Sequence, residues 1–274
     1  MMLLVLLLAC VTGAPERHGP DDPPRDSTPT DSDADTDTDT DTDTDTDTTD
    51  TDTDTDTDTT SPCPADMALV GGACMDLYEA PNRAGALPLV MYSFDEAEDW
   101  CQARDKRLCT DAEWELACAG AQGQAYPYGD AHQPGVCNDE ETWLVYSQDQ
   151  LNTWPSDASE PEIESLEDLF ARAASIGSGA IAADEVQSLY QGEGGGENPG
   201  CAGAAGVFDL VGNVEEWTRR ADGGSAEFHG NLKGRYWAEA RTCQSGVTTH
   251  GDGFRFYEIG FRCCGERNGG PGGG

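Results

Sequence analysis

The sequence predicts a disulfide-linked domain of the mixed α+β class at residues 63–274, preceded by an apolar leader and an acidic tether. Eleven cysteines are present, and all except Cys10 lie between Cys63 and Cys264. An even number of cysteines behind a leader is typical of an exported domain that folds in an oxidising compartment. Signals for short strands and for helices are interspersed with loops rich in glycine and proline, which indicates elements of both kinds. Metal-bound thiols are the alternative, but the domain has no Cys-x-x-Cys pair and few histidines.

The first ten residues resemble the signal peptide of a bacterial lipoprotein. The apolar run of MMLLVLLLACVTGA is too short to span a bilayer. It ends in Leu7-Leu8-Ala9-Cys10, which resembles the cleavage box after which the cysteine becomes a lipidated N-terminus. This resemblance implies an exported protein that is anchored at the bacterial cell envelope through lipid on Cys10. An ordinary secretory signal, and hence a secreted protein, is the alternative.

Residues 11–62 are expected to form a disordered tether. A stretch rich in proline, aspartate and arginine leads into almost pure Asp-Thr alternation from Asp33 to Thr60. Alternation with period two usually indicates a strand, but here no position is apolar and the carboxylates repel one another. We therefore expect an extended segment that holds the domain away from a membrane. The formal net charge of the chain is -38, which argues against nucleic acid as a partner.

Two helix starts are marked by capping boxes. In SFDEAEDWCQARDKRL, Ser93 and Glu96 have the spacing at which each side chain caps the backbone of the other. In TDAEWELACAG, Thr110 and Glu113 repeat this arrangement, and Gly120 suits the end of the helix. These signals are structural and do not indicate a chemistry.

Short strands are expected near the start of the domain, and an insertion is expected in its middle. Met67–Val70, followed by a Gly-Gly turn, predicts one strand, and Leu77–Glu79 predicts a second. Residues 142–196 are predicted to form an insertion on the domain, with helices in SEPEIESLEDLFARAAS and AADEVQSLYQ. Such segments often carry contacts with partners.

The stretch VFDLVGNVEEWTRR, residues 207–220, places two acids in an apolar segment. An unpaired carboxylate at Asp209 or Glu216 would cost several kcal/mol on burial, or would be forced to take up a proton. Such acids can cap turns or pair with an arginine. The candidate arginines are Arg219, Arg220 and Arg262.

Six motifs resemble those of the formylglycine-generating enzyme family, also called the sulfatase-modifying factor family. RLCTDAEWELACAG, YPYGD, VCND, GVFDLVGNVEEWT, GGS and IGFRC occur here in the family's order. The family's motifs read RLPTEAEWE, YPWG, CN, GLYDMVGNVWEW, RGGS and GFR. The resemblance covers residues 65–264 apart from the insertion. It implies an irregular α+β fold related to C-type lectins, with little regular secondary structure.

The resemblance also implies structural calcium. A first site would use two side chains and two backbone carbonyls, those of Asp209, Glu216, Gly212 and Val214. A second, weaker site would use Asn138 with the carbonyl of Asp139, and its other half would lie beyond the insertion. Calcium takes six to eight oxygen ligands and mixes carboxylates with carbonyls, so these residue types suit it.

Five disulfides are expected. The resemblance implies Cys101–Cys263 and Cys118–Cys243. Cys109 and Cys264 are additions to the family pattern, and we expect them to pair with each other. By elimination, the remaining pairs are Cys137–Cys201 and Cys63–Cys74, the second of which closes a small loop.

The chain departs from the family where the oxidase holds copper. Formylglycine-generating enzymes oxidise a cysteine in a Cys-x-Pro-x-Arg segment, and two cysteines after the GGS motif bind copper(I). The matching stretch, Gly223 to Cys243, has no cysteine before Cys243, so we expect no copper site and no catalytic residues. The three histidines of the related iron-dependent sulfoxide synthases are missing too. We therefore expect a surface-tethered, non-catalytic module that binds a protein, peptide or glycan. A copper-dependent oxidase acting on sulfatase cysteines and a calcium-dependent, lectin-like glycan binder are the alternatives.

The expected ligand surface is the cleft that corresponds to the family's catalytic site. It would be lined by aromatic and cationic side chains, namely Phe228, His229, Lys233, Arg235, Tyr236 and Trp237. The alternative is that Tyr236 and Trp237 are core residues.

Overall fold

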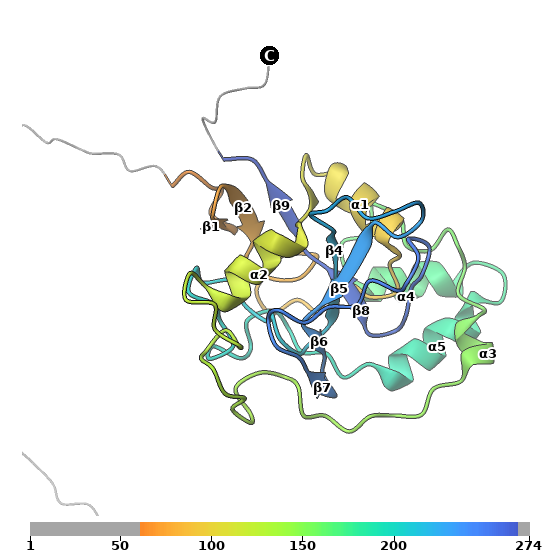
Figure 1. The fold of residues 1–274 in the computed structure, drawn as a ribbon. Helices are drawn as coiled ribbons and strands as arrows, with labels where there is room; N and C mark the ends of the chain where they lie inside the picture. The colour runs from red at the N-terminus through yellow and green to blue at the C-terminus, as the bar shows by residue number, and fades with distance from the viewer. Residues whose placement is uncertain (1–60, 268–274) are drawn as a thin grey trace, which may run out of the picture. The chain divides into compact units, whose positions relative to one another are not determined.

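The computed structural model describes residues 61–267 of the 274-residue chain. Cys10, the leader and the Asp-Thr tether lie outside these described residues. Within them, helices and short strands are joined by long irregular segments, as the α+β prediction requires (Figure 1). No helix of this part of the chain has the length and apolar character needed to cross a bilayer.

Three small sheets form the β structure. The first has the strand order β1-β2-β9-β3, the second β5-β4-β8, and the third is the pair β6-β7. The first comprises β1 Met67–Val70, β2 Ala73–Asp76, β3 Arg107–Leu108 and β9 Cys263–Gly265. The other two comprise β4 Glu215–Arg219, β5 Gly230–Lys233, β6 Arg235–Tyr236, β7 Glu239–Ala240 and β8 Ile259–Phe261. In the second sheet β4 is central, antiparallel to β5 and parallel to β8.

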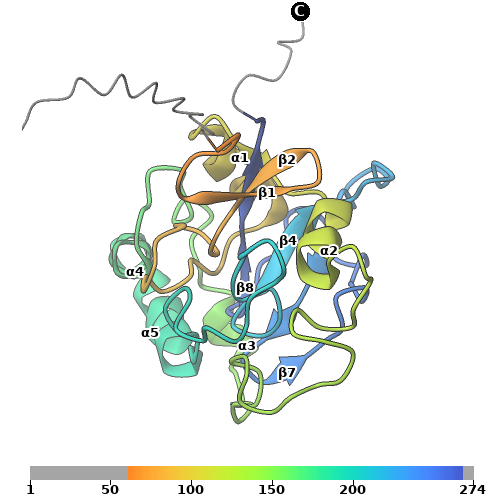
Figure 2. The ribbon, with the colours of Figure 1, turned by 90° about the vertical axis from the view of Figure 1, so that its left-hand side faces the viewer.

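The two predicted helix starts are confirmed. In α1, Phe94–Gln102, Ser93 Oγ accepts from the Glu96 amide and Glu96 Oε2 accepts from the Ser93 amide. Thr110 and Glu113 make the same two bonds at the start of α2, Asp111–Ala119, and Gly120 ends this helix with a positive φ. In Figure 2, α2 lies beside the β1–β2 hairpin.

The predicted strand at Leu77–Glu79 is wrong. The strand that pairs with β1 is β2, which ends at Asp76. Beyond it the backbone bonds to loops instead of a strand, because the Leu77 amide donates to the Asp66 carbonyl and the Tyr78 amide to Asn82 Oδ1. The Gly-Gly turn leads directly into β2 at Ala73, so the second strand begins earlier than predicted.

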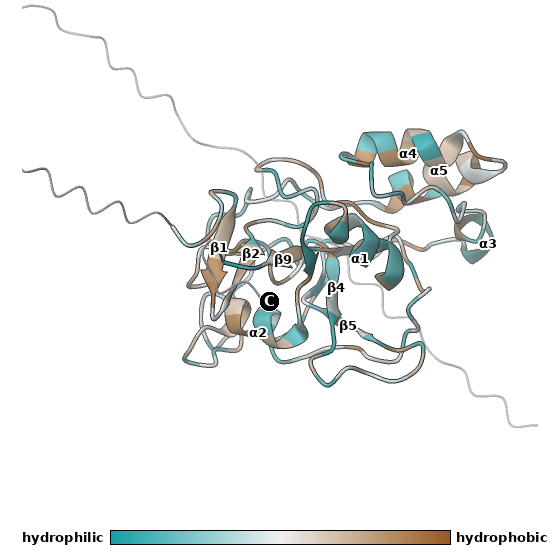
Figure 3. Cartoon of the chain, turned by 90° about the horizontal axis from the view of Figure 1, so that it is seen from above, coloured by the Kyte–Doolittle hydropathy of each residue, from teal (hydrophilic) through white to brown (hydrophobic). Residues whose placement is uncertain are grey.

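The insertion contains α3 Gln148–Leu151, α4 Leu166–Ala174 and α5 Gly179–Leu189. Both predicted helices are present, but the first begins at Leu166, after a cap by Ser165. Figure 3 shows α3, α4 and α5 together at one side of the domain. Their buried residues, such as Leu169 and Val186, belong to the same apolar cluster as Trp217 of β4. The insertion is therefore part of the core and not an addition on its surface.

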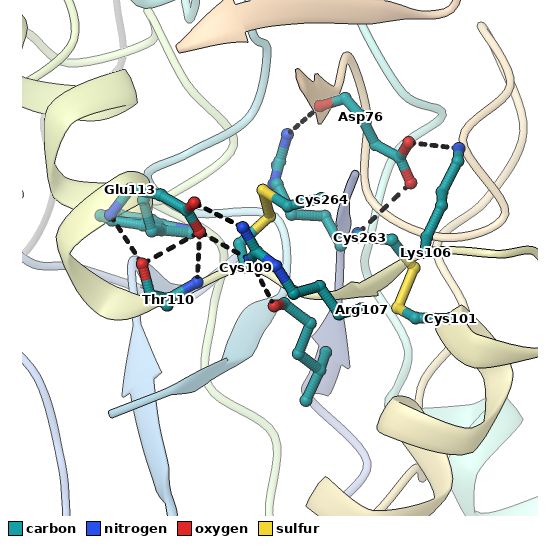
Figure 4. Close-up of a disulfide and its surroundings, with 12 residues drawn as sticks. Asp76, Cys101, Lys106, Arg107, Cys109, Thr110, Glu113, Cys263 and Cys264 are labelled. Carbon is teal, nitrogen blue, oxygen red and sulfur yellow. Dashed lines mark hydrogen bonds and ion pairs between the residues drawn. A yellow bond between two sulfur atoms is a disulfide. The ribbon is translucent and has the colours of Figure 1, made fainter. Parts of the chain in front are cut away.

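Five disulfides connect the described cysteines. They are Cys63–Cys74, Cys101–Cys263, Cys109–Cys264, Cys118–Cys243 and Cys137–Cys201, the pairs expected from the sequence. Two of them involve adjacent residues of β9: Cys263 is bonded to Cys101 of α1, and Cys264 is bonded to Cys109 (Figure 4). This density of disulfides is typical of proteins that fold outside the reducing cytoplasm.

Candidate functional site

Glu216 is held by an arginine. Its carboxylate lies in β4 and is fully buried. Arg262, which follows β8, donates from Nε to Glu216 Oε2 and from Nη2 to Oε1, both at 2.7 Å. Trp114 Nε1 donates to the same Oε2 at 3.1 Å. Arginine pairing was one of the alternatives considered for this acid, and here it compensates the buried charge.

Arg262 also joins the surrounding loops. Its Nη2 donates to the Phe208 carbonyl at 2.9 Å, and Nη1 lies 3.4 Å from the carbonyls of Asp76 and Leu77. Burial alone would lower the pKa of this guanidinium, but the contact with Glu216 outweighs it and the pKa lies above its usual value. The side chain is therefore a permanent buried cation between β2, β4 and the Phe208 turn.

Asp209 lies near Glu79, a residue that the sequence analysis missed. Asp209 Oδ2 accepts from the Gly196 amide at 2.7 Å, and burial raises the pKa of Asp209 to about 6. Burial and the nearby Asp209 raise the pKa of Glu79 well above its usual value. Glu79 Oε1 accepts from Asn213 Nδ2 at 3.0 Å, whereas Oε2 is buried without a hydrogen-bond partner among the described residues. No sequence motif pointed to Glu79 as a site residue, because it lies in a predicted strand, far from the acidic motif in sequence.

The calcium ligands expected from the family motif do not fit as a complete set. Glu216 has both carboxylate oxygens engaged by Arg262 and Trp114, so it has no free oxygen facing a metal. Within residues 61–267, no group of three or more His, Cys, Asp or Glu side chains is spaced to hold a metal ion. Asp209 and the unpartnered oxygen of Glu79 do suit an oxygen-bound cation, and carbonyls such as those of Gly212 and Val214 would have to complete its shell.

The weaker expected site lies against the first one. Asn138 Nδ2 donates to the Gln191 carbonyl at 3.0 Å and to Asn213 Oδ1 at 3.2 Å. Asp139 Oδ2 lies 2.9 Å from His132 Nε2, while its Oδ1 is buried without a hydrogen-bond partner among the described residues. Burial raises the pKa of Asp139. The end of the insertion, at Gln191, thus closes over the residues on which both expected sites depend.

Three of the six residues expected to line a ligand cleft are buried, and this part of the prediction is corrected. Tyr236 and Trp237 are core residues, which was the alternative considered. Lys233 is buried too, and its Nζ lies 2.7 Å from Glu115 Oε1.

Phe228 and His229, two other residues of the expected cleft, are not buried. His229 Nδ1 contacts Asp252 Oδ2 at 2.7 Å, so this imidazole already has a carboxylate partner. Of the six expected residues, Arg235 lines a cavity of about 280 Å³ beside the insertion. Tyr236 and Trp237 supply hydrophobic packing, because their large rings belong to the main apolar cluster.

A family model described as the sulfatase-modifying factor enzyme 1-like domain matches residues 46–267. The chain belongs to this family. Family membership confirms the expected fold class, an irregular α+β fold of the formylglycine-generating-enzyme and C-type-lectin-like kind with five disulfides.

Relatives of this sulfatase-modifying factor-like chain include proteins described as inactive and one described as an enzyme. Inactive C-alpha-formylglycine-generating enzyme 2 from Bos taurus is 29% identical over 153 residues, 56% of this chain and 39% of the relative. The protein of that name from Mus musculus is 29% identical over 154 residues, 56% of this chain and 38% of the relative. Formylglycine-generating enzyme from Mycobacterium tuberculosis is 26% identical over 140 residues, 50% of this chain and 34% of the enzyme. The chain thus matches less than two fifths of the length of these curated relatives.

Two solved structures show a more distant likeness. PvdO from Pseudomonas aeruginosa matches with a TM-score of 0.38 and 15% identity, covering 72% of this chain and 69% of PvdO. Treponema denticola variable protein 1 matches with a TM-score of 0.33 and 17% identity, covering 59% of this chain and 48% of that protein.

Proposed function

We propose that the domain is a non-catalytic member of its family that serves as a binding module at a cell surface. The observation that carries this proposal is the state of the cysteines. All ten cysteines within residues 61–267 are in disulfides. Copper(I) is bound by soft ligands such as thiolates, and a disulfide sulfur is not a thiolate. The stretch that matches the family's copper ligands contains only Cys243, which is bonded to Cys118.

Two further observations support the non-catalytic part of the proposal. His229, which lies in the same stretch, is already engaged by Asp252. Two relatives carry the description of inactive formylglycine-generating enzymes, and the matched region covers more than half of this chain. The ligand of the module would be a protein, a peptide or a glycan.

A turnover assay tests the proposal. The full chain is given copper(I), oxygen and a peptide with a Cys-x-Pro-x-Arg segment, and the peptide is followed by mass spectrometry. We expect no conversion of the cysteine to an aldehyde, because no thiolate pair is present to hold copper. The Mycobacterium tuberculosis enzyme is the positive control. Aldehyde formation by this chain would overturn the proposal and favour the copper-dependent oxidase.

The lipid anchor is a separate proposal. Cys10 ends the apolar leader at a lipoprotein-like cleavage box, and the following tether carries no positive charge beyond Arg17 and Arg25. Lipid on Cys10 would hold the module at the bacterial envelope, with the acidic tether as a spacer. We expect Cys10→Ser to move the protein from the membrane fraction to the soluble fraction. Equal membrane recovery of the wild type and the variant would contradict the anchor.

Calcium at the Val207–Arg220 segment is also a proposal. Its support is that three buried carboxyl groups, Glu79, Asp209 and Glu216, face the single guanidinium of Arg262. A calcium ion held by Asp209 and Glu79, with backbone carbonyls, would supply the missing positive charge. We expect calcium, relative to a chelator, to raise the melting temperature of the wild type but not of Asp209→Asn. A matched control is Glu227→Gln, which removes an exposed charge elsewhere. No calcium effect on the wild type would exclude the site.

A further inference from the structure

A cavity of about 280 Å³ lies between the second sheet and the start of the insertion. Glu215 of β4, Arg235 of β6 and Glu258, which precedes β8, form its polar wall. Aromatic rings of Tyr146, Phe254 and Phe256 form an apolar wall. Its volume is slightly below the range of pockets for drug-sized molecules, so it suits a compact head group.

The polar wall has fewer cationic than anionic side chains. Arg235 Nη1 lies 3.3 Å from Glu215 Oε2, and Arg235 Nε lies 2.9 Å from Glu239 Oε2. Arg241 lies within 3.9 Å of Glu215 and within 3.7 Å of Glu239. The guanidinium groups of Arg235 and Arg241 thus form their ion pairs mainly with Glu215 and Glu239.

Glu258 is the carboxyl group that remains least compensated. Its side chain is only 9% exposed, and its ion-pair contact is with Arg235 Nη1 at 4.0 Å, the limit of such a pair. Burial, with Glu215 nearby, raises the pKa of Glu258 to about 7. A cation that enters the cavity would favour the ionised form of a buried carboxyl group that faces it and lacks a full counter-charge.

The apolar wall offers ring faces for a cation. Tyr146 and Phe256 pack edge to face with their ring centroids 5.0 Å apart, and Phe254 and Phe256 stack with their centroids 6.1 Å apart, so the three rings are neighbours in this wall. His250 stacks on Phe254 with their ring centroids 3.9 Å apart, and burial together with Arg235 lowers the pKa of His250, which disfavours a positive charge on this imidazole. The faces of aromatic rings attract ammonium groups, most strongly where water is excluded.

We propose that this cavity binds an alkylammonium group, either of a small amine or of a lysine side chain on a protein partner. The proposal rests on the binding role above and names the chemistry of the ligand. An anion would meet an excess of carboxylates. A bare metal ion would find no group of three acidic, histidine or cysteine side chains spaced to hold it within the described residues.

The surface beside the cavity suits the apolar part of such a ligand. Trp143 is 51% exposed and Val145 is 80% exposed, and both precede Tyr146 in the insertion. Trp143 packs edge-on against Tyr146, with their ring centroids 6.4 Å apart. A ligand that enters the cavity would change the environment of Trp143, so tryptophan fluorescence reports binding.

The test is a titration of the full chain with butylammonium chloride and with tetramethylammonium chloride at constant ionic strength. Butanol is the neutral control. Fluorescence and calorimetry are read for the wild type and for Glu258→Gln, which keeps the shape of the side chain. Tyr146→Leu removes a ring face without removing apolar contact. Glu227→Gln is the matched control, since it removes an exposed carboxylate outside this cavity.

We expect saturable binding of both cations by the wild type and by Glu227→Gln. Affinity should fall at least about tenfold in Glu258→Gln and should also weaken in Tyr146→Leu. Absence of saturable binding, equal binding of butanol, or unchanged affinity in both cavity variants would overturn the proposal. If Glu258→Gln does not fold, unchanged affinity in Tyr146→Leu alone overturns it.

A second pair of probes separates the two sources of the cation. A blocked tripeptide with a central lysine is compared with its norleucine counterpart. Tighter binding of the lysine peptide than of butylammonium supports a protein partner, and equal binding supports a small amine. The turnover assay is independent of this test, because aldehyde formation would remove the non-catalytic proposal without affecting amine binding.

Discussion

Arg262 lies among three buried acids from two different parts of the chain. Its guanidinium makes two short bonds to Glu216, and Glu79 and Asp209 lie near enough to raise its pKa further. A planar guanidinium can serve a carboxylate and several carbonyls at once, which a lysine ammonium cannot do with the same geometry. The apolar segment that carries Asp209 and Glu216 is thus compatible with burial because a cation is buried with it.

Loss of this cation should be costly. We expect Arg262→Met to lower the free energy of unfolding by about 3–5 kcal/mol, because Glu216 is left buried without its partner. Arg172→Met is the matched control. The pair of Arg172 with Glu160 is exposed on both sides, so its loss should cost less than about 1 kcal/mol. Both values are measured by denaturant unfolding, and similar small losses in the two variants would contradict the assigned role of Arg262.

At the scale of elements, strand β9 is the point at which the chain is bonded to itself twice. Successive side chains of a strand point to opposite faces, so Cys263 and Cys264 reach different partners although they are neighbours. One bond holds α1 and the other holds the segment after β3. The sequence separations they span are 162 and 155, so the two closed loops are almost the same loop.

Because the two closed loops nearly coincide, the losses of stability on removing Cys101–Cys263 and Cys109–Cys264 should not be additive. With either bond intact, the other closes a ring of about nine residues, and its loss should cost about 2–3 kcal/mol. Loss of both also opens a loop that the intact Cys118–Cys243 bond limits to about 30 residues, and should cost about 6 kcal/mol in total in the chain-entropy account. We therefore expect the Cys101→Ala/Cys263→Ala and Cys109→Ala/Cys264→Ala pairs, combined, to exceed the sum of their separate effects in denaturant unfolding. A simple sum would contradict the nested-loop explanation.

At the scale of the whole molecule, acidity is distributed between surface and interior. The chain has 53 acidic and 15 basic residues, and several of its acids are buried. Burial raises the pKa of Asp76 to about 6 although Lys106 contacts it at 2.6 Å, and raises that of Glu258 to about 7. The folded chain therefore keeps protons on these groups at pH values where the unfolded chain has lost them.

The sign of the pH dependence follows from proton binding. Between about pH 4 and pH 7 the folded state binds more protons than the unfolded state at Asp76 and Glu258, so stability falls as pH rises. We expect the urea midpoint of the full chain to be lower at pH 8 than at pH 5. Groups facing Glu258 are Glu215, Arg235, Tyr257 and Glu239. The fall of the urea midpoint with rising pH should be smaller in Glu258→Gln than in the wild type, and unchanged in Glu227→Gln. A urea midpoint that rises between pH 5 and pH 8 would contradict the raised pKa values assigned to Asp76 and Glu258.

The sequence by itself determined the features that depend on near neighbours or on motif order. The capping boxes at Ser93 and Thr110 depend on residues three positions apart, so the helix starts could be located directly. The six ordered motifs indicated the family and its fold. Cysteine pairs followed from the family pattern and from elimination among few remaining choices.

Only the tertiary structure decided which charges and rings meet. Glu216 is 46 positions from Arg262, and Asn213 is 134 positions from Glu79, and no local pattern records such contacts. The expectation that Tyr236 and Trp237 line a cleft was wrong, because they were assigned by their motif neighbourhood, while packing placed both rings in the core. The cavity at Glu258 forms only where β4, β6 and the insertion come together. The physical reason is that burial and charge compensation are properties of a three-dimensional neighbourhood, which the fold assembles from distant parts of the chain.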